Sequence, residues 1–97
     1  MFSSQTMTKR QLIDIVARKA HLTKRAATEA VETFLEEVVR QLQKGERIVL
    51  SGFGTFHVIQ MKAKRVIVPK SGVERQVPAH RLPRFIPGKT LKRIIKK

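Results

Sequence analysis

Cysteine, tryptophan and tyrosine are absent from this 97-residue chain, and acidic residues are scarce. Without cysteine the protein can form neither a disulfide nor a thiolate metal site, which is compatible with a reducing compartment. No apolar run approaches the roughly 20 residues that a membrane-spanning helix needs. The N-terminus also lacks the apolar core of a signal peptide. These absences disfavour disulfide scaffolds and membrane-spanning helical proteins.

The scarcity of acidic residues is uneven along the chain. Twenty-one Lys and Arg stand against seven Asp and Glu, a formal net charge of +14. Residues 1–46 hold eight basic and six acidic side chains, a net of +2, whereas residues 47–97 hold thirteen basic and one acidic, a net of +12. Such a positive half predicts a polyanionic partner, above all nucleic acid. The alternative, a solvated surface kept charged for solubility, is disfavoured by this asymmetry.

The short length limits the architecture. We expect a single domain over residues 8–97 after a flexible N-terminal extension over residues 1–7. A domain this short leaves about a third or more of its unfolded surface exposed, so oligomerisation would stabilise it. A monomer with a large buried active site is not expected.

The first half has the apolar period of two helices. Thr8 and Gln11 have the spacing of a capping box and predict a helix over residues 9–20. Thr23 can cap a second helix, and Gly45 is placed to end it. One short partner helix cannot cover the wide apolar side of this second helix, so we expect a second copy of the chain against it. Its apolar positions are Ala27, Ala30, Val31, Phe34, Leu35, Val38, Val39 and Leu42.

From Arg47 onward the period is that of β-strands. Gly52-Phe53-Gly54 permits a tight reversal, and the prolines of residues 82–88 suit an edge strand. A short helix is predicted from Lys89 to Ile95. The chain is thus expected to form an α+β fold with a two-helix hairpin base, a three-stranded antiparallel β-sheet extended into a long β-arm, and a short C-terminal helix. Its sparse phenylalanines suit a core better than a base-stacking platform; they are Phe53, Phe56 and Phe85.

The arm is predicted over approximately residues 60–78, around a turn at Pro69-Lys70-Ser71-Gly72. A two-stranded ribbon is marginal alone in water, so a partner should stabilise its working conformation. The pairs expected from a turn at residues 70–71 are Val68 with Val73, Ile67 with Glu74, Val66 with Arg75 and Arg65 with Gln76. This register gives an apolar strip of Val66, Val68 and Val73, which would rest against the sugar walls of a groove or meet another protein chain.

Two sequence motifs, when they occur together, are highly specific for one protein family. They are Leu50-Ser51-Gly52-Phe53-Gly54-Thr55-Phe56 and Pro83-Arg84-Phe85-Ile86-Pro87-Gly88-Lys89, accompanied by Gly45-Glu46, Pro69, Gly72 and Pro78-Ala79. With this order of elements, residues 7–97 resemble the bacterial HU/IHF histone-like DNA-binding proteins without a gap, and the HU type is favoured.

The resemblance implies an obligate, intertwined homodimer, or a heterodimer, whose arms enter the minor groove of double-stranded DNA. With its arms in this groove, the dimer would bend and compact DNA with little sequence preference. It would act as a nucleoid-associated protein of the cytoplasm. Pro69 occupies the position of the family's intercalating wedge, although a proline here could also merely start the turn. The DNA-binding residues expected are Lys62, Lys64, Arg65, Pro69, Lys70, Arg75, Arg81, Lys89, Lys92 and Arg93.

The arm also departs from the family pattern. Family arms usually carry basic residues at the positions of Ile59 and Met61. They also usually have a Gly-Arg-Asn run where this chain has Val66-Ile67-Val68. The tip therefore lacks the polar groups that usually contact base edges and sugars, and we expect shape contacts there more than hydrogen bonds.

Catalytic chemistry finds no support in the sequence. His21, His57 and His80 fall on separate predicted elements, without a nucleophile, a carboxylate cluster or a glycine-rich phosphate loop. We expect no enzyme activity, cofactor, metal site, membrane contact or small-molecule substrate. Two other functions stay open: a subunit of a sequence-specific IHF-type heterodimer, and a small basic RNA-binding protein.

Overall fold

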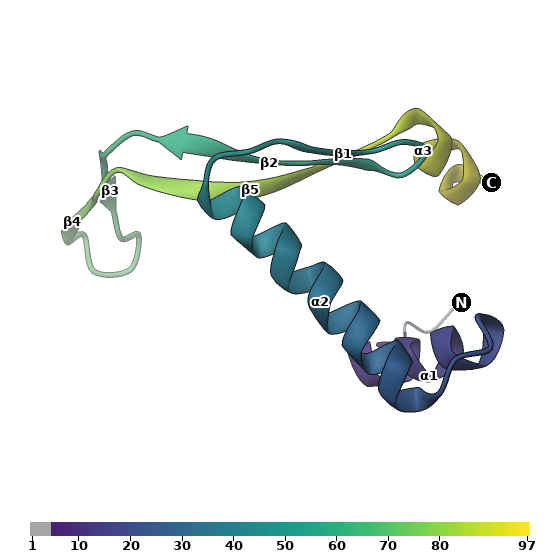
Figure 1. Cartoon of the computed structure of the whole chain (residues 1–97). Helices are drawn as coiled ribbons and strands as arrows, with labels where there is room; N and C mark the ends of the chain where they lie inside the picture. The colour runs from purple at the N-terminus through teal and green to yellow at the C-terminus, as the bar shows by residue number, and fades with distance from the viewer. Residues whose placement is uncertain (1–4) are drawn as a thin grey trace. The chain divides into compact units, whose positions relative to one another are not determined.

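The computed structural model describes residues 5–97, in one unit that ends at Val39 and a second unit of Arg40–Lys97 (Figure 1). The predicted extension over residues 1–7 lies mostly outside the described residues, and residues 5–8 have no regular secondary structure. The order of elements confirms the predicted α+β fold. The elements are α1 (Lys9–Lys19), α2 (Lys24–Gln43), β1 (Ile48–Leu50), β2 (Gly54–Met61), β3 (Lys64–Ile67), β4 (Glu74–Val77), β5 (His80–Pro87) and α3 (Lys89–Lys96).

Both predicted helix starts in the first unit are present. The Thr8 N–H donates to Gln11 Oε1 at 2.9 Å, and the Gln11 N–H donates to Thr8 Oγ1 at 3.2 Å, which completes the capping box of α1. At α2, the Ala26 N–H donates to Thr23 Oγ1 at 3.0 Å. These side chains satisfy amide groups that have no partner inside the helix. Helix α1 ends at Lys19, one residue before the predicted end.

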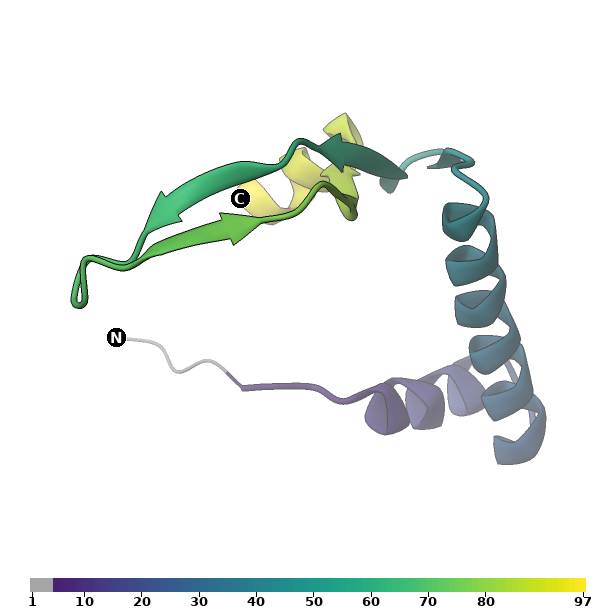
Figure 2. The ribbon, with the colours of Figure 1, turned by 90° about the vertical axis from the view of Figure 1, so that its left-hand side faces the viewer.

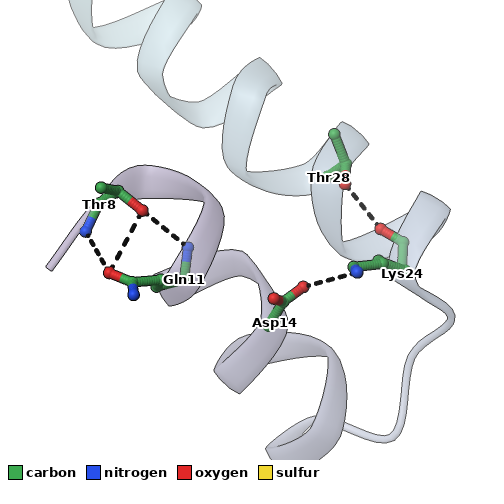
Figure 3. Close-up of polar contacts among 5 residues, drawn as sticks. All are labelled: Thr8, Gln11, Asp14, Lys24 and Thr28. Atoms are coloured by element: carbon green, nitrogen blue, oxygen red, sulfur yellow. Dashed lines mark hydrogen bonds and ion pairs between the residues drawn. The ribbon is translucent and has the colours of Figure 1, made fainter.

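Polar side chains join α1 to α2. Lys24 Nζ lies 3.2 Å from Asp14 Oδ1 (Figure 3). Lys9 also pairs with Glu32. Thr28 Oγ1 donates to the Lys24 carbonyl at 2.7 Å, one turn back along α2. The interhelical ion pairs are half-exposed, so each adds little stability and serves mainly to orient the two helices.

The three-stranded sheet of the second unit has the order β1-β2-β5, antiparallel throughout. Its first turn is closed by the Phe53 N–H, which donates to the Leu50 carbonyl at 2.9 Å, and Gly52 has a φ of 83° there. Strand β5 is an edge strand, as its prolines predicted. It pairs with β2 from Gly54 opposite Pro87 to Met61 opposite His80.

The arm continues from this sheet as a separate two-stranded ladder of β3 and β4. Met61 lies opposite His80 and Lys64 opposite Val77, so two residues on each strand separate the ladders without a bulge. One of these residues, Pro78, has no amide hydrogen to donate to a ladder. The predicted arm is therefore confirmed, but its pairing is interrupted at residues 62–63 and 78–79. Figure 2 shows its strands running to one closed turn.

Little apolar surface is buried in the single chain. Among residues 5–97, only Ile13 and Ala27 are buried hydrophobic side chains. The Phe85 ring lies 5.4 Å from Phe53 and 4.8 Å from Phe56 between centroids, so it packs against both of the other phenylalanines that were predicted to lie in the core. Even so, Phe53 is 46% exposed. The isolated chain therefore has only the beginnings of a core.

Candidate nucleic-acid interface

The turn at the tip of the arm presents Pro69. The Val68 N–H donates to the Val73 carbonyl at 2.9 Å, and the Gly72 N–H donates to the Val68 carbonyl at 2.8 Å. Gly72 has a φ of 68°, a conformation that glycine adopts without strain. Pro69 is exposed and has no N–H, so its ring projects from a turn that is held closed by its neighbours.

The register of the tip agrees with the sequence-based pairs. Arg65 lies opposite Gln76, Val66 opposite Arg75 and Ile67 opposite Glu74. Because successive residues of a strand alternate between faces, Val66, Val68 and Val73 share one face, and the predicted apolar strip is present. Val73 is 54% exposed and Val66 36%. Ile67, on the other face, is 67% exposed and was not part of the predicted strip.

Five of the predicted basic residues lie on the arm. Lys64 and Arg65 are on β3, and Arg75 is on β4. Lys62 lies at the joint between the ladders, and Lys70 lies in the tip turn. All of these are exposed, so the structure brings them together along one hairpin arm. Exposed cations spaced along a ribbon can contact successive phosphates of a nucleic acid.

Arg81 has a more specific environment than the sequence indicated. Its Nη2 donates to the carbonyl of Gln43 at 3.0 Å, at the C-terminal end of α2. A cation suits a helix C-terminus, where carbonyl groups lack partners inside the helix. Arg81 therefore joins β5 to the end of α2. It is nevertheless an exposed residue.

The predicted basic residues of α3 lie close together. Lys89, Lys92 and Arg93, with Lys96 and Lys97, line an open hollow of about 490 Å³. Gly88 anchors the start of the helix, because its N–H donates to the Phe53 carbonyl at 2.9 Å. On the apolar side, Ile94 is 61% and Ile95 72% exposed.

Sequence reasoning missed basic residues on the sheet itself. Arg84 lies opposite His57, on the face of the sheet that alternates with Phe56 and Phe85. Ile48 lies opposite Phe56 in the antiparallel pairing of β1 with β2. If this register is continued by one residue, Arg47 lies opposite His57. Arg47, His57 and Arg84 thus form a row across the sheet. The alternation of side chains along a strand would have predicted this row once β2 was paired with both of its neighbours.

No metal or membrane signal accompanies these cations. Within residues 5–97 no group of three or more His, Cys, Asp and Glu is placed to hold a metal ion. No helix in the same range is long and apolar enough to cross a bilayer. The exposed side chains of the arm are mostly cationic or apolar, with Glu74 and the uncharged Gln76 among the exceptions.

The comparisons with known proteins agree with this geometry. The family model described as "Bacterial DNA-binding protein" matches residues 7–96. DNA-binding protein HU of Geobacillus stearothermophilus is 39% identical over 90 residues, which cover 93% of this chain and 100% of the relative. DNA-binding protein HU-alpha of Vibrio proteolyticus is 43% identical over 90 residues, with the same coverage of both chains.

Solved structures give the same result. The Anabaena HU in a cocrystal structure with DNA has a TM-score of 0.85 and 34% identity, covering 92% of this chain and 97% of that one. HU of Thermotoga maritima has a TM-score of 0.65 and 32% identity, covering 92% of this chain and 98% of that one. This chain therefore belongs to the bacterial DNA-binding protein family, in which the relatives named above are HU proteins.

Proposed function

We propose that this protein is an architectural, histone-like protein that binds, bends and compacts double-stranded DNA through its β-arm. The exposed basic arm, closed by a turn that presents Pro69, is the observation that carries this proposal. Its cations neutralise phosphates along the strands and its tip enters the minor groove, where the Pro69 ring wedges between base pairs. A ring without an N–H can replace base stacking at an opened step without leaving a donor unpaired.

The active form is a homodimer. Side chains on α2 support this part of the proposal, because Phe34 is 51%, Leu35 42% and Val39 54% exposed in the single chain. An apolar stripe of this kind is stabilised by removal from water, and a second copy presents the same stripe. Two copies also supply two arms, which can hold a duplex from both sides.

Binding has little sequence preference. Val66, Ile67 and Val68 offer no hydrogen-bonding side chain to base edges, so the tip follows the shape of the groove. This favours the HU type of function over the sequence-specific IHF-type heterodimer, and the named relatives are HU proteins. The protein acts without a catalytic step, as a component of the nucleoid in the cytoplasm.

A competition experiment tests this function. Labelled random-sequence duplex is bound at about 0.1 M salt and challenged with an unrelated duplex, with A-form RNA, and with a small molecule that fills the minor groove. The unrelated duplex should compete equally, the RNA weakly, because its grooves differ in width and depth. The groove-filling molecule should release the protein. Equal competition by RNA would instead favour the RNA-binding alternative.

A further inference from the structure

One carboxylate stands alone in the basic half of the chain. Glu74 is the single acidic residue among residues 47–97, which hold thirteen basic ones. It begins β4, on the arm, where a negative charge opposes binding to a polyanion. Its position therefore needs an explanation beyond the general charge of the chain.

Glu74 pairs with an arginine of the opposite strand. Arg65 Nη1 lies 3.4 Å from Glu74 Oε1, diagonally across the β3–β4 ladder, in which Arg65 faces Gln76 and Ile67 faces Glu74. Their side chains are 76% and 59% exposed. An exposed pair at this distance is held loosely and exchanges its partner readily.

The same residues line a small hollow. Arg65, Arg75 and Gln76 surround a space of about 240 Å³ together with Glu74. Arg65 and Gln76 share one face of the ladder with Glu74, whereas Arg75 lies on the other face. The guanidinium group of Arg65 and the amide of Gln76 are donors suited to the oxygens of a phosphate group. The carboxylate of Glu74 contributes the acceptor oxygen that Arg65 contacts.

We infer that this hollow is a phosphate-binding site of the arm and that Glu74 is its built-in competitor. In the free protein, Glu74 accepts from Arg65; on DNA, a backbone phosphate takes its place and Glu74 turns to solvent. This competition lowers the affinity of the arm for the duplex but keeps the phosphate site intact. The arm therefore releases the duplex more readily than its positive charge alone would allow. This inference rests on the DNA-binding function proposed above.

Glu74→Gln tests the site because it removes the competing charge and keeps the shape of the side chain. One phosphate contact with a salt slope of about 0.9 contributes about eightfold to affinity between 1 M and 0.1 M salt. We therefore expect Glu74→Gln to bind a random duplex about three- to eightfold more tightly at 0.1 M salt. The measurement is fluorescence anisotropy with the full chain, with circular dichroism to verify that each variant is folded.

Glu29→Gln is the matched control. It removes the same charge from another exposed Arg–Glu pair, in which Arg25 Nε lies 3.6 Å from Glu29 Oε1 on α2. Its affinity should stay within about twofold of wild type, because it lies outside the arm. Equal gains for both variants would mean that only the net charge matters, and would overturn the inference.

Arg65→Gln completes a double-mutant cycle. If Glu74 competes for Arg65, the gain from Glu74→Gln is larger with Arg65 present than in the Arg65→Gln background. Equal gains in both backgrounds would show that Glu74 only repels the duplex through space, and would overturn its role as a competitor. Failure of the wild-type protein to bind any duplex would instead contradict the proposed function, and this inference with it.

Discussion

Replacing Pro69 with alanine should reduce DNA bending much more than it changes the stability of the protein. The tip turn is held by hydrogen bonds of Val68, Gly72 and Val73, and Pro69 donates none of them. Pro69 is exposed, so the substitution should change the free energy of unfolding by less than about 1 kcal/mol. The effect on DNA is larger, because opening one base step costs a few kcal/mol that only a wedge offsets.

The expected size of this effect follows from the lost wedge. If the ring offsets about 2 kcal/mol per opened step, its removal makes the kinked step about 25-fold less populated. Affinity should fall by less than about tenfold, because the cations of the arm keep their phosphates. Bending is measured by energy transfer between dyes at the two ends of a short duplex, under saturating protein.

Lys70→Ala is the control for this experiment, since Lys70 is the next residue in the same exposed turn. It should lower affinity and the salt dependence of binding while the saturated bend stays as in wild type. An unchanged bend in the Pro69→Ala complex would refute the wedge, and Pro69 would then only start the turn.

Further predictions concern the fold and the dimer. Gly54→Ala should destabilise the protein by about 1–3 kcal/mol in thermal denaturation, because a Cβ there would lie 2.6 Å from the Ile86 carbonyl oxygen and the Phe85 ring; unchanged stability would contradict this packing. Phe34→Asp should shift the protein toward monomers in sedimentation velocity, because it places a charge on an apolar stripe that a second copy covers; an undisturbed dimer would place the interface elsewhere. Thr8→Ala should lower stability by about 1 kcal/mol through loss of the α1 cap, and a change near zero would show that the capping box is dispensable.

Local rules predicted most of the fold. The caps at Thr8 and Thr23 and the turn at residues 70–71 each depend on a few neighbouring residues, and each is present. The interruption at residues 62–63 and 78–79 was harder to predict. It depends on two strands that are distant in sequence, and on Pro78, which has no N–H for a ladder.

The part of the candidate site that could be predicted is the part that the density of basic residues in the sequence identifies. The basic residues of the arm and of α3 stand out in the sequence, and all are exposed. The Arg65–Glu74 pair was missed, although the predicted register of the arm places these two residues diagonally across the ladder. The helix-capping contact of Arg81 was missed because it depends on the spatial arrangement of elements that are distant in sequence. The Arg84 and His57 pair was missed for the same reason. The roles of these residues in DNA binding remain predictions.

The salt dependence of duplex binding tests the central claim most directly. Six of the predicted cations lie on the arm or, in the case of Arg81, on β5 at its base; they are Lys62, Lys64, Arg65, Lys70, Arg75 and Arg81. If both arms of a dimer used all of them, the logarithm of the binding constant would fall with the logarithm of salt concentration with a slope of about −11. We expect a slope between about −5 and −11 for a random duplex, since some of these cations contact protein groups. A slope near zero would contradict a protein that holds DNA through its phosphates.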